Sequence, residues 1–308
     1  MATTTDTVTA PGPVAGPGVR RFPPRALTGL AKFAGIVPFT VYIALGLIIP
    51  LIAIVIGAFK NPNTNAFTFS NVNIALHGAY LDGFRQSLIL SVLAAVIPGV
   101  FGLLIAYAIF TAKRASFLRQ VVITASGVFA NFGGVPLAFL FIASLGSTAL
   151  VTGWLSDIGL NIYSDGFSLY TLSGIVVVYM YFQIPLMVLI ILPALEGLRP
   201  SWREAAENLG ARSWQYWRHI GGPVLMPSFL SCLMLLFGSS LAAYATAETL
   251  TSGTIPLTAI QIGSFLNGNV IAGQANVGKA LGLGMVLIIA VVMVAYVVLQ
   301  RRAAKWLQ

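Results

Sequence analysis

Six long apolar stretches divide this 308-residue chain, and they restrict its fold more than any other feature of the sequence. They lie at about 33–59, 86–110, 120–146, 170–193, 224–248 and 278–300. Each is close to the roughly 20 apolar residues that one helix needs to cross a bilayer. Charged residues make up only 8% of the chain, whereas soluble domains carry about 25%. The pattern predicts an all-α integral membrane protein with six transmembrane helices.

The N-terminal segment 1–32 differs in composition from everything after it. It is rich in Ala, Thr, Pro and Gly, and such a segment has too few large apolar side chains to bury a core. We therefore expect a disordered tail at 1–32 and a single six-helix membrane domain at 33–308. The first apolar run starts late and is longer than the core of a secretory signal peptide, so it is expected to remain as an uncleaved anchor.

Positive charges are distributed unevenly between the two sides of the predicted membrane domain. They cluster at the two termini and in two alternate loops, as Arg20, Arg21, Arg25, Lys32, Lys113, Arg114, Arg119, Arg199, Arg203, Arg212, Arg218, Arg301, Arg302 and Lys305. The opposite connections, about 60–85, 147–169 and 249–277, hold only Lys60, Arg85 and Lys279. Because cytoplasmic loops are enriched in Lys and Arg, both termini are predicted to be cytoplasmic. The formal charge of +9 then reflects topology and not nucleic-acid binding.

The loop between the fourth and fifth spans, residues 199–223, is the one strongly polar segment between apolar stretches; we call it the handle. Ser201 and Glu204 have the spacing of a capping box at the start of a helix. Gly210 stands where a helix ends in a left-handed residue. A helix with signals at both ends is suited to docking on a soluble partner. The residues alone leave open an alternative, a loop helix that lies on the membrane without a partner.

The second half of the handle, about 213–220, carries aromatic residues suited to a membrane–water interface, Trp214, Tyr216 and Trp217. Pro223 is expected to open the fifth span near its first turn, where a missing N–H costs least. Ala205 and Ala206 leave part of the preceding helix without bulk, which allows another surface to approach closely.

The handle resembles a known motif. Glu204-Ala205-Ala206, then Gly210, Ile220 and Pro223, have the spacing of the EAA loop of permease subunits in binding-protein-dependent ABC importers. Gly222 stands where that family usually has Leu. Over about 33–308 the chain is similar to the permeases of spermidine/putrescine importers.

This resemblance implies a type I ABC importer permease fold in a prokaryotic cytoplasmic membrane, with a separate cytoplasmic ATPase subunit, a second permease subunit and an extracytoplasmic solute-binding protein as partners. The handle would be the coupling helix that docks on the ATPase. The positions implied for that role are Ser201, Glu204, Ala205, Ala206, Gly210, Ile220 and Pro223. The resemblance also implies a polyamine cargo, while iron, thiamine, phosphonate and sugar remain alternatives.

A translocation path needs polar groups at membrane depth, and few are present. Besides the carboxylate Glu248, the candidates are Tyr107, Asn131, Tyr179, Gln183 and Tyr244. Intramembrane ionisable residues are costly and often functional, which favours Glu248. Gly133, Gly134 and Pro136 predict a break in the third span, and broken helices commonly line transport cavities.

Other classes of function fit the sequence less well. An ion-coupled transporter needs intramembrane ionisable groups, and apart from Glu248 the spans hold almost none. A membrane-embedded enzyme needs clustered acids, bases or nucleophiles at membrane depth, and none is found. Residues 273–280 are close to a P-loop, but Ala280 replaces the Ser or Thr that would hold Mg²⁺. We therefore expect no catalytic, metal or cofactor site, and an ATPase on another polypeptide.

Overall fold

The computed structural model describes residues 36–112, 116–164, 166–268 and 274–304. The predicted tail at 1–32 lies outside these residues. The chain divides into two parts, Met1–Leu51 and Ile52–Gln308, and each is described by itself. Within the described residues the regular structure is helical, apart from one bridge between Lys60 and Phe67. The first part contributes α2 (Val37–Ile43), the π-helical turn η1 (Ala44–Ile48) and the beginning of α3 (Ile49–Ala58).

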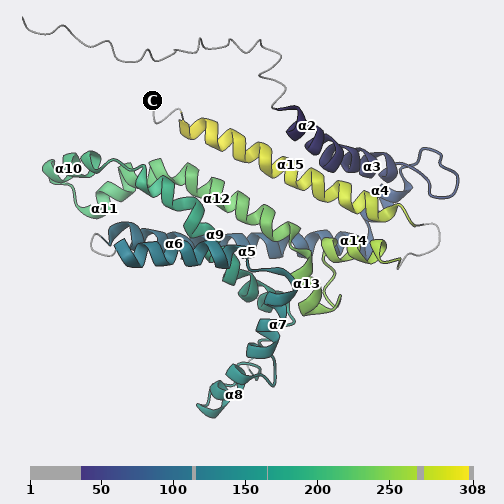
Figure 1. Ribbon diagram of the computed structural model, residues 1–308, viewed down its shortest axis with the longest axis horizontal. Coiled ribbons are helices and arrows are strands. Elements are labelled where there is room, and N and C mark those ends of the chain that lie inside the picture. Colours follow the sequence, from purple (N-terminus) through teal and green to yellow (C-terminus); the bar gives the residue numbers. More distant parts are fainter. Residues whose placement is uncertain (1–35, 113–115, 165, 269–273, 305–308) are drawn as a thin grey trace, which may run out of the picture. The chain divides into compact units, whose positions relative to one another are not determined.

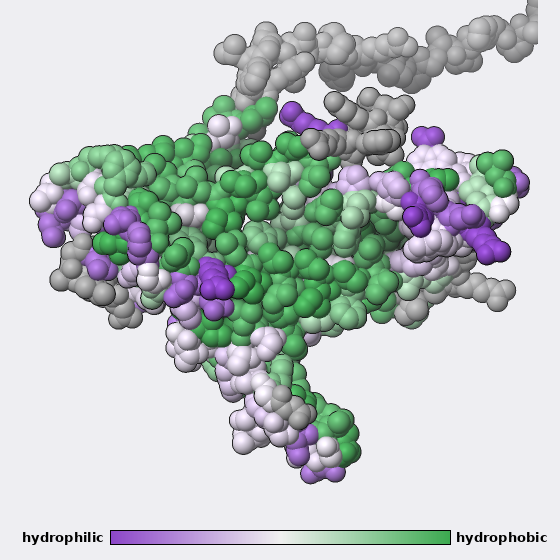
Figure 2. All heavy atoms as spheres, turned by 180° about the vertical axis from the view of Figure 1, so that it is seen from behind, coloured by the Kyte–Doolittle hydropathy of each residue, from purple (hydrophilic) through white to green (hydrophobic). Residues whose placement is uncertain are grey.

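Six helical stretches are long and apolar enough to cross a membrane, which confirms the predicted fold class. They are Val37–Ala58, Gly78–Thr111, Gly134–Asp157, Leu172–Glu196, Ser213–Ala242 and Val277–Arg301. The second is the single helix α5, the fourth is α9, and the last belongs to α15 (Val277–Ala304). Shorter helices α4 (Ser70–Ala75) and α14 (Thr258–Leu266) lie in the connections. Figure 2 shows that most of the visible surface is hydrophobic, with smaller hydrophilic patches between and beside the hydrophobic areas.

The third apolar stretch is divided, as its Gly and Pro residues predicted. Helix α6 (Ser116–Asn131) ends before Gly133, and α7 (Gly134–Leu145) begins with Gly134 at φ +75°. Pro136 then falls in the first turn of α7, where no helical N–H is needed. The predicted span 120–146 is wrong in its bounds, because α6 is a separate helix. The stretch that qualifies as a span also includes α8 (Leu150–Asp157), which was expected to be part of a connection.

The fifth span also differs from the predicted 224–248. Helix α11 (Ser213–Tyr216), the π-helical turn η2 (Trp217–Gly221) and α12 (Gly222–Ala242) follow one another without a gap. At Ala243 the backbone leaves the helical region, with ψ 89°, and a new helix α13 (Tyr244–Thr251) begins. The span therefore starts within the handle, and Glu248 lies on a separate helix beyond a break.

Helix α9 lies at the centre of the part from Ile52 onward, packed against α5, α6 and α12 (Figure 1). Its buried side chains include Tyr179, Gln183, Met187 and Ile191. Helix α12 in turn packs against α5 and α15. Side chains of α9 contribute to two of the three buried clusters, which explains why this span shows no clear polar face in the sequence.

Candidate functional site

The handle begins with helix α10 (Pro200–Asn208), whose start differs from the prediction. Arg199 is the residue before the first turn, with φ −68° and ψ 126°, and no side-chain capping bond is formed there. Ser201 lies inside the helix, so the predicted Ser201–Glu204 capping box is wrong. The physical reason is Pro200: its fixed φ suits the first helical position, where no N–H donor is required.

The end of α10 confirms the prediction for Gly210. Gly210 has φ +76°, a conformation that a side chain disfavours. Its N–H donates to the carbonyl oxygen of Glu207 at 2.9 Å, and the N–H of Ala211 donates to that of Ala206 at 2.9 Å. These two bonds form a Schellman motif, which satisfies the last carbonyl groups of the helix.

The second half of the handle is not a separate segment. The side chain of Gln215 accepts a hydrogen bond from the N–H of Arg212 at 2.7 Å and so starts the helix. The turn Trp217–Gly221, which contains Ile220, is π-helical. It lies just before Pro223, which has no N–H to give to a preceding carbonyl, and a π turn of this kind allows the helix to continue.

Three of the predicted handle residues come together around one hollow. Ala206, Gly210 and Ile220 line a recess of about 340 Å³ together with the buried Tyr216. Ala206 itself is buried, whereas Ser201, Glu204 and Ala205 are exposed. Pro223 lies in the first turn of α12. The structure therefore separates the predicted residues into an inner set that fixes α10 in place and an outer set that is free for contact.

An exposed apolar residue in the handle escaped the sequence analysis. Leu209 is 88% exposed at the end of α10, directly before Gly210. Exposure of a single large apolar side chain is common, but this one lies one turn from the exposed Ala205 and also lines the recess of Ala206 and Gly210. The sequence did hold a signal for this exposed residue, because an apolar residue directly before the terminal Gly of an otherwise polar helix is unusual.

Charges on the side of α10 that borders Tyr107 are partly paired. The Nε of Arg203 donates to the carboxylate of Glu207 at 2.9 Å, and both side chains are 56% exposed. This hydrogen bond raises the pKa of Arg203. The ion pair supports the helix by only about 0.3–0.5 kcal/mol, as exposed i,i+4 pairs do.

A second cluster of polar side chains surrounds the break between α12 and α13. The hydroxyl of Tyr179 donates to the carbonyl oxygen of Ala243 at 2.7 Å. The amide nitrogen of Gln183 donates to the carbonyl oxygen of Leu236 at 3.0 Å and also contacts the hydroxyl of Ser240. Both side chains are fully buried. Tyr179 and Gln183 therefore hold the backbone of the break and have no surface open to a solute within this chain.

The two helix breaks are joined by Thr246, which the sequence analysis missed. The N–H of Gly134 donates to the hydroxyl oxygen of Thr246 at 2.9 Å, and this hydroxyl lies 3.3 Å from the carbonyl oxygen of Gly134. Gly134 starts α7, and Thr246 lies in the first turn of α13. We call this pair of breaks, with Tyr179 and Gln183, the break cluster. A Thr among many in apolar stretches gave no signal of such a contact.

The remaining candidate path residues occupy different places. Glu248 is partly buried on α13, and its Oε2 atom is buried without a hydrogen-bond partner among the described residues. Tyr244 begins the same helix, with its ring beside Gly263. Asn131 donates to the carbonyl oxygen of Gly127 at 2.9 Å and is exposed. Tyr107 stands apart from them, because its ring meets Trp217 of the handle edge-on at 5.2 Å between ring centres.

Neither cluster has the composition of a catalytic or metal centre. Within the part of the chain that the structure describes, His, Cys, Asp and Glu side chains form no group of three that could hold a metal ion. The arrangement offers a stiff surface helix at one place and two joined helix breaks at another, which suits mechanical movement of helices.

Comparison with known proteins identifies the family. The model of the family described as "Binding-protein-dependent transport system inner membrane component" matches residues 12–307. The sulfate permease CysT of Escherichia coli is 31% identical over 162 residues, 52% of this chain and 55% of that protein. The ferric permease FbpB of Actinobacillus pleuropneumoniae is 27% identical over 252 residues, 79% of this chain and 34% of that protein. The chain thus spans about half or less of the length of these two relatives.

Solved structures agree on the fold. A bacterial ABC transporter that imports alginate has a chain with TM-score 0.69 and 20% identity, covering 90% of this chain and 96% of that one. The same type of transporter in complex with an alginate-bound periplasmic protein gives TM-score 0.72 and 19% identity, with the same coverage. The expected type I importer permease fold is confirmed. The matched relatives are named as sulfate, ferric and thiamine permeases, so the spermidine/putrescine assignment is narrower than the family.

Permeases of this family are multi-pass inner-membrane subunits, and they operate with an ATPase, a second permease and a binding protein. The chain belongs to the family of inner-membrane components of binding-protein-dependent transport systems, as a permease subunit of an ABC importer and not as an enzyme.

Proposed function

We propose that this chain moves solute across the membrane under force that a separate ATPase applies to the handle. The observation that carries the proposal is the closed end of α10, where Gly210 completes a Schellman motif next to the exposed residues Ala205 and Leu209. A helix of this length is marginal in water by itself. Its fixed geometry therefore suits a contact that must transmit force.

The connection from the handle to the membrane supports the same function. Helix α11, the turn η2 and α12 form one continuous helical path from Ser213 to Ala242. The buried Ala206 and Tyr216 attach α10 to the start of this path. A displacement of α10 is therefore passed directly to the fifth span, at whose far end lies the break cluster. ATP can shift the equilibrium between two conformations of the transporter only by the difference in its affinity for them.

The orientation belongs to this proposal. With both termini in the cytoplasm, the handle lies on the side where ATP is available. The charge asymmetry of the connecting segments supports this orientation.

We further propose that the cargo is a small organic cation of polyamine type and that Glu248 contacts it. The carboxylate lies just beyond the break at Ala243, and its Oε2 atom has no partner among the described residues. A buried carboxylate without a partner is costly, and an ammonium group of the solute would supply one. Tyr244 and Asn131 flank the two breaks and are proposed to line the same path.

The proposal is tested by placing a thiol on the outer surface of α10. The chain has one cysteine, Cys232, which is buried, so the variant C232A provides a background for Ala205→Cys. In inverted membrane vesicles from which the ATPase has been washed off, the thiol at 205 is expected to react with a membrane-impermeant maleimide. When the ATPase is added back, the thiol should be protected from the maleimide and should cross-link to the ATPase.

The matched control is Leu160→Cys, an exposed position on the connection after α8. It should be labelled only in right-side-out vesicles and should not cross-link to the ATPase. Labelling of residue 205 in right-side-out vesicles would refute the proposed orientation. Cross-linking of both thiols to the same partner would refute the proposed contact.

Reconstitution separates this function from that of an ion-coupled transporter. The purified chain in liposomes is expected to be inert, and uptake should appear only with the ATPase, the second permease and the binding protein. Uptake by the chain alone under an ion gradient would support the alternative class.

A further inference from the structure

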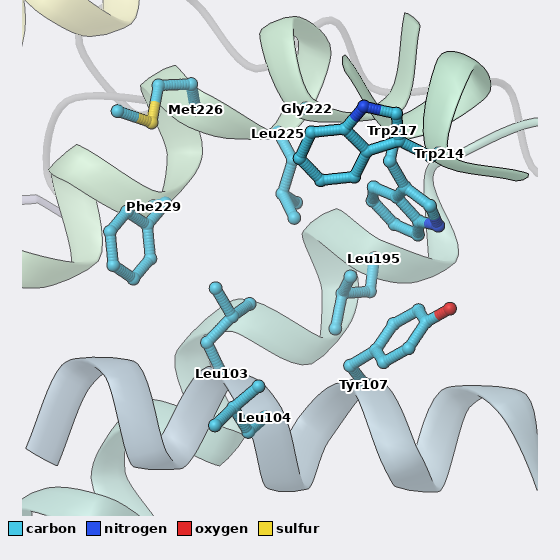
Figure 3. Close-up of a pocket in the computed structure, with 10 residues that line it drawn as sticks. All are labelled: Leu103, Leu104, Tyr107, Leu195, Trp214, Trp217, Gly222, Leu225, Met226 and Phe229. Carbon is cyan, nitrogen blue, oxygen red and sulfur yellow. The ribbon is translucent and has the colours of Figure 1, made fainter.

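An apolar groove lies beside the handle, between α5, α9 and the helical path α11–α12. It has a volume of about 460 Å³ and is lined almost wholly by apolar groups. Figure 3 shows Leu103, Leu104 and Tyr107 rising from α5 on one side of it. Leu225, Met226 and Phe229 of α12 and the indoles of Trp214 and Trp217 lie opposite. Clefts that hold small ligands have volumes of about 300–1,000 Å³, and the groove falls within this range.

A second hollow of different chemistry adjoins the groove. Tyr107 and Trp217 line both. The second hollow, about 440 Å³, is bounded by the charged residues Arg199, Arg203, Glu204 and Glu207 at the start of α10. Arg203 and Glu207 pair with each other at 2.9 Å. Arg199, whose guanidinium lies 5.8 Å from the ring centre of Trp202, and Glu204 therefore provide one positive and one negative group in this second hollow.

An apolar groove next to one positive and one negative side chain matches the chemistry of a zwitterionic phospholipid, which has apolar acyl chains and a headgroup with both charges. The groove is formed by membrane-spanning helices, so the bilayer is the medium available to fill it. Tryptophan rings at its charged end favour the headgroup level of a membrane. An Arg beside the phosphate and a carboxylate beside an ammonium group would complement such a headgroup.

We propose that this groove is a specific site for a phosphatidylethanolamine of the leaflet on the handle's side. One acyl chain lies between Leu104 and Met226, the phosphate faces Arg199, and the ammonium group faces Glu204. The lipid contacts both α5 and the handle through Tyr107 and Trp217. It would therefore fill the space beneath the joint between the handle and the fifth span.

The experiment measures bound lipid on the full-length chain, purified from membranes with its co-purifying subunits. The complex is exchanged into mixed nanodiscs with equal phosphatidylethanolamine and phosphatidylglycerol. It is then extracted in mild detergent, and retained lipid is counted by native mass spectrometry. Wild type is expected to retain phosphatidylethanolamine at least about tenfold over phosphatidylglycerol, a difference of about 1.4 kcal/mol.

Two pairs of variants locate the site. Leu104→Trp fills the groove, whereas its neighbour Ile105→Trp is exposed on α5 outside the groove. Arg199→Gln removes the phosphate contact, whereas Arg218→Gln removes an exposed charge of the handle that lines neither hollow. Retention should fall to the level of bulk lipid in L104W and R199Q and stay at the wild-type level in I105W and R218Q. Equal size-exclusion profiles and helix content of all four variants show that they are folded.

Other results overturn the site. Equal retention of the two lipids by wild type, or equal retention in both members of a pair, shows ordinary boundary lipid. A protein occupant is revealed if Leu104→Cys in the C232A background cross-links to the second permease while no lipid is retained.

Discussion

The handle and the break cluster are built by different kinds of contact. In the handle, α10 is closed by bonds between residues three to five apart, such as Ala211 to Ala206. In the break cluster, Gly134 and Thr246 are 112 residues apart, and Tyr179 and Ala243 are 64 apart. Local bonds fix the shape of one element, whereas distant bonds fix how two elements meet. The handle is therefore suited to transmit force as a unit, and the break cluster to change when helices move.

The largest effect is expected from Gly210→Asp. Its φ of +76° disfavours any side chain, and the new charge would disturb the surface proposed to contact the ATPase. We expect ATP-driven uptake to be abolished while the protein remains folded in the membrane. Uptake into proteoliposomes and pull-down of the ATPase measure the two effects.

Gly159→Asp is the matched control for this substitution. Gly159 also has a positive φ, +86°, and it ends α8 by the same motif. The N–H of Gly159 donates to the carbonyl oxygen of Ser156, and the N–H of Leu160 donates to the carbonyl oxygen of Leu155. The local strain of the two substitutions is therefore expected to be similar, roughly 1–2 kcal/mol. Equal loss of uptake in the two variants would show that strain alone, and not the handle, is responsible.

Much of the handle was predictable because its signals are close together in the sequence. The left-handed Gly210 follows from its position after a run of helix formers, and it is confirmed. The prediction for Ser201 was wrong because the spacing of a capping box can also occur inside a helix. Here the helix already begins at Pro200, so Ser201 is its second residue. The family spacing singled out Ala206, Gly210 and Ile220, but that they line one hollow was not predicted.

The break cluster was predictable only in part. Gly133, Gly134 and Pro136 indicate a break by local rules, and the break is confirmed. The break at Ala243 was not predicted, because residues 240–246 are all acceptable in a helix and only contacts with Tyr179 and Gly134 select another conformation. Tyr179 and Gln183 were chosen as polar residues at membrane depth, but periodicity does not distinguish a side chain that binds backbone from one that faces a solute.

Glu248→Gln is expected to have the next largest effect, and it tests the proposed cargo. The substitution keeps the shape and removes the negative charge of the side chain. If a cationic solute is bound there, uptake of a polyamine should fall about tenfold, equivalent to about 1.4 kcal/mol, with no loss of thermal stability, because the substitution removes an unpartnered charge. The control is Glu196→Gln, whose carboxylate pairs with Arg119 at the end of α9; no change of uptake is expected. Unaltered polyamine uptake in E248Q would exclude the proposed contact.

Thr246→Val should have a smaller effect that is specific to the junction of the breaks. The N–H of Gly134, which is partly buried, would lose its acceptor, and the cost is at most the about 1–3 kcal/mol of a fully buried unpaired donor. We expect a lower thermal midpoint and a several-fold slower uptake, measured on the same preparation. Thr249→Val is the control, since the hydroxyl of Thr249 bonds only the carbonyl of Ala245 in its own helix. If both variants behave alike, the contact between the breaks does not contribute to stability.

The smallest effect is expected from Glu207→Gln in the handle. Its partner Arg203 is 56% exposed, so solvent and salt screen the pair, and about 0.3–0.5 kcal/mol is lost at most. The bond raises the pKa of Arg203, so the guanidinium stays charged to higher pH. The contribution of the pair to stability is therefore present at neutral pH. It is lost only when strongly alkaline pH removes the charge of Arg203. Uptake should therefore stay within about twofold of wild type, since a free-energy change of this size alters an equilibrium by about that factor. Uptake measured between pH 6 and 8 at low and high salt checks this. A large loss would mean that the ATPase binds this pair directly, and that the contact surface extends from Ala205 and Leu209 to the other side of α10.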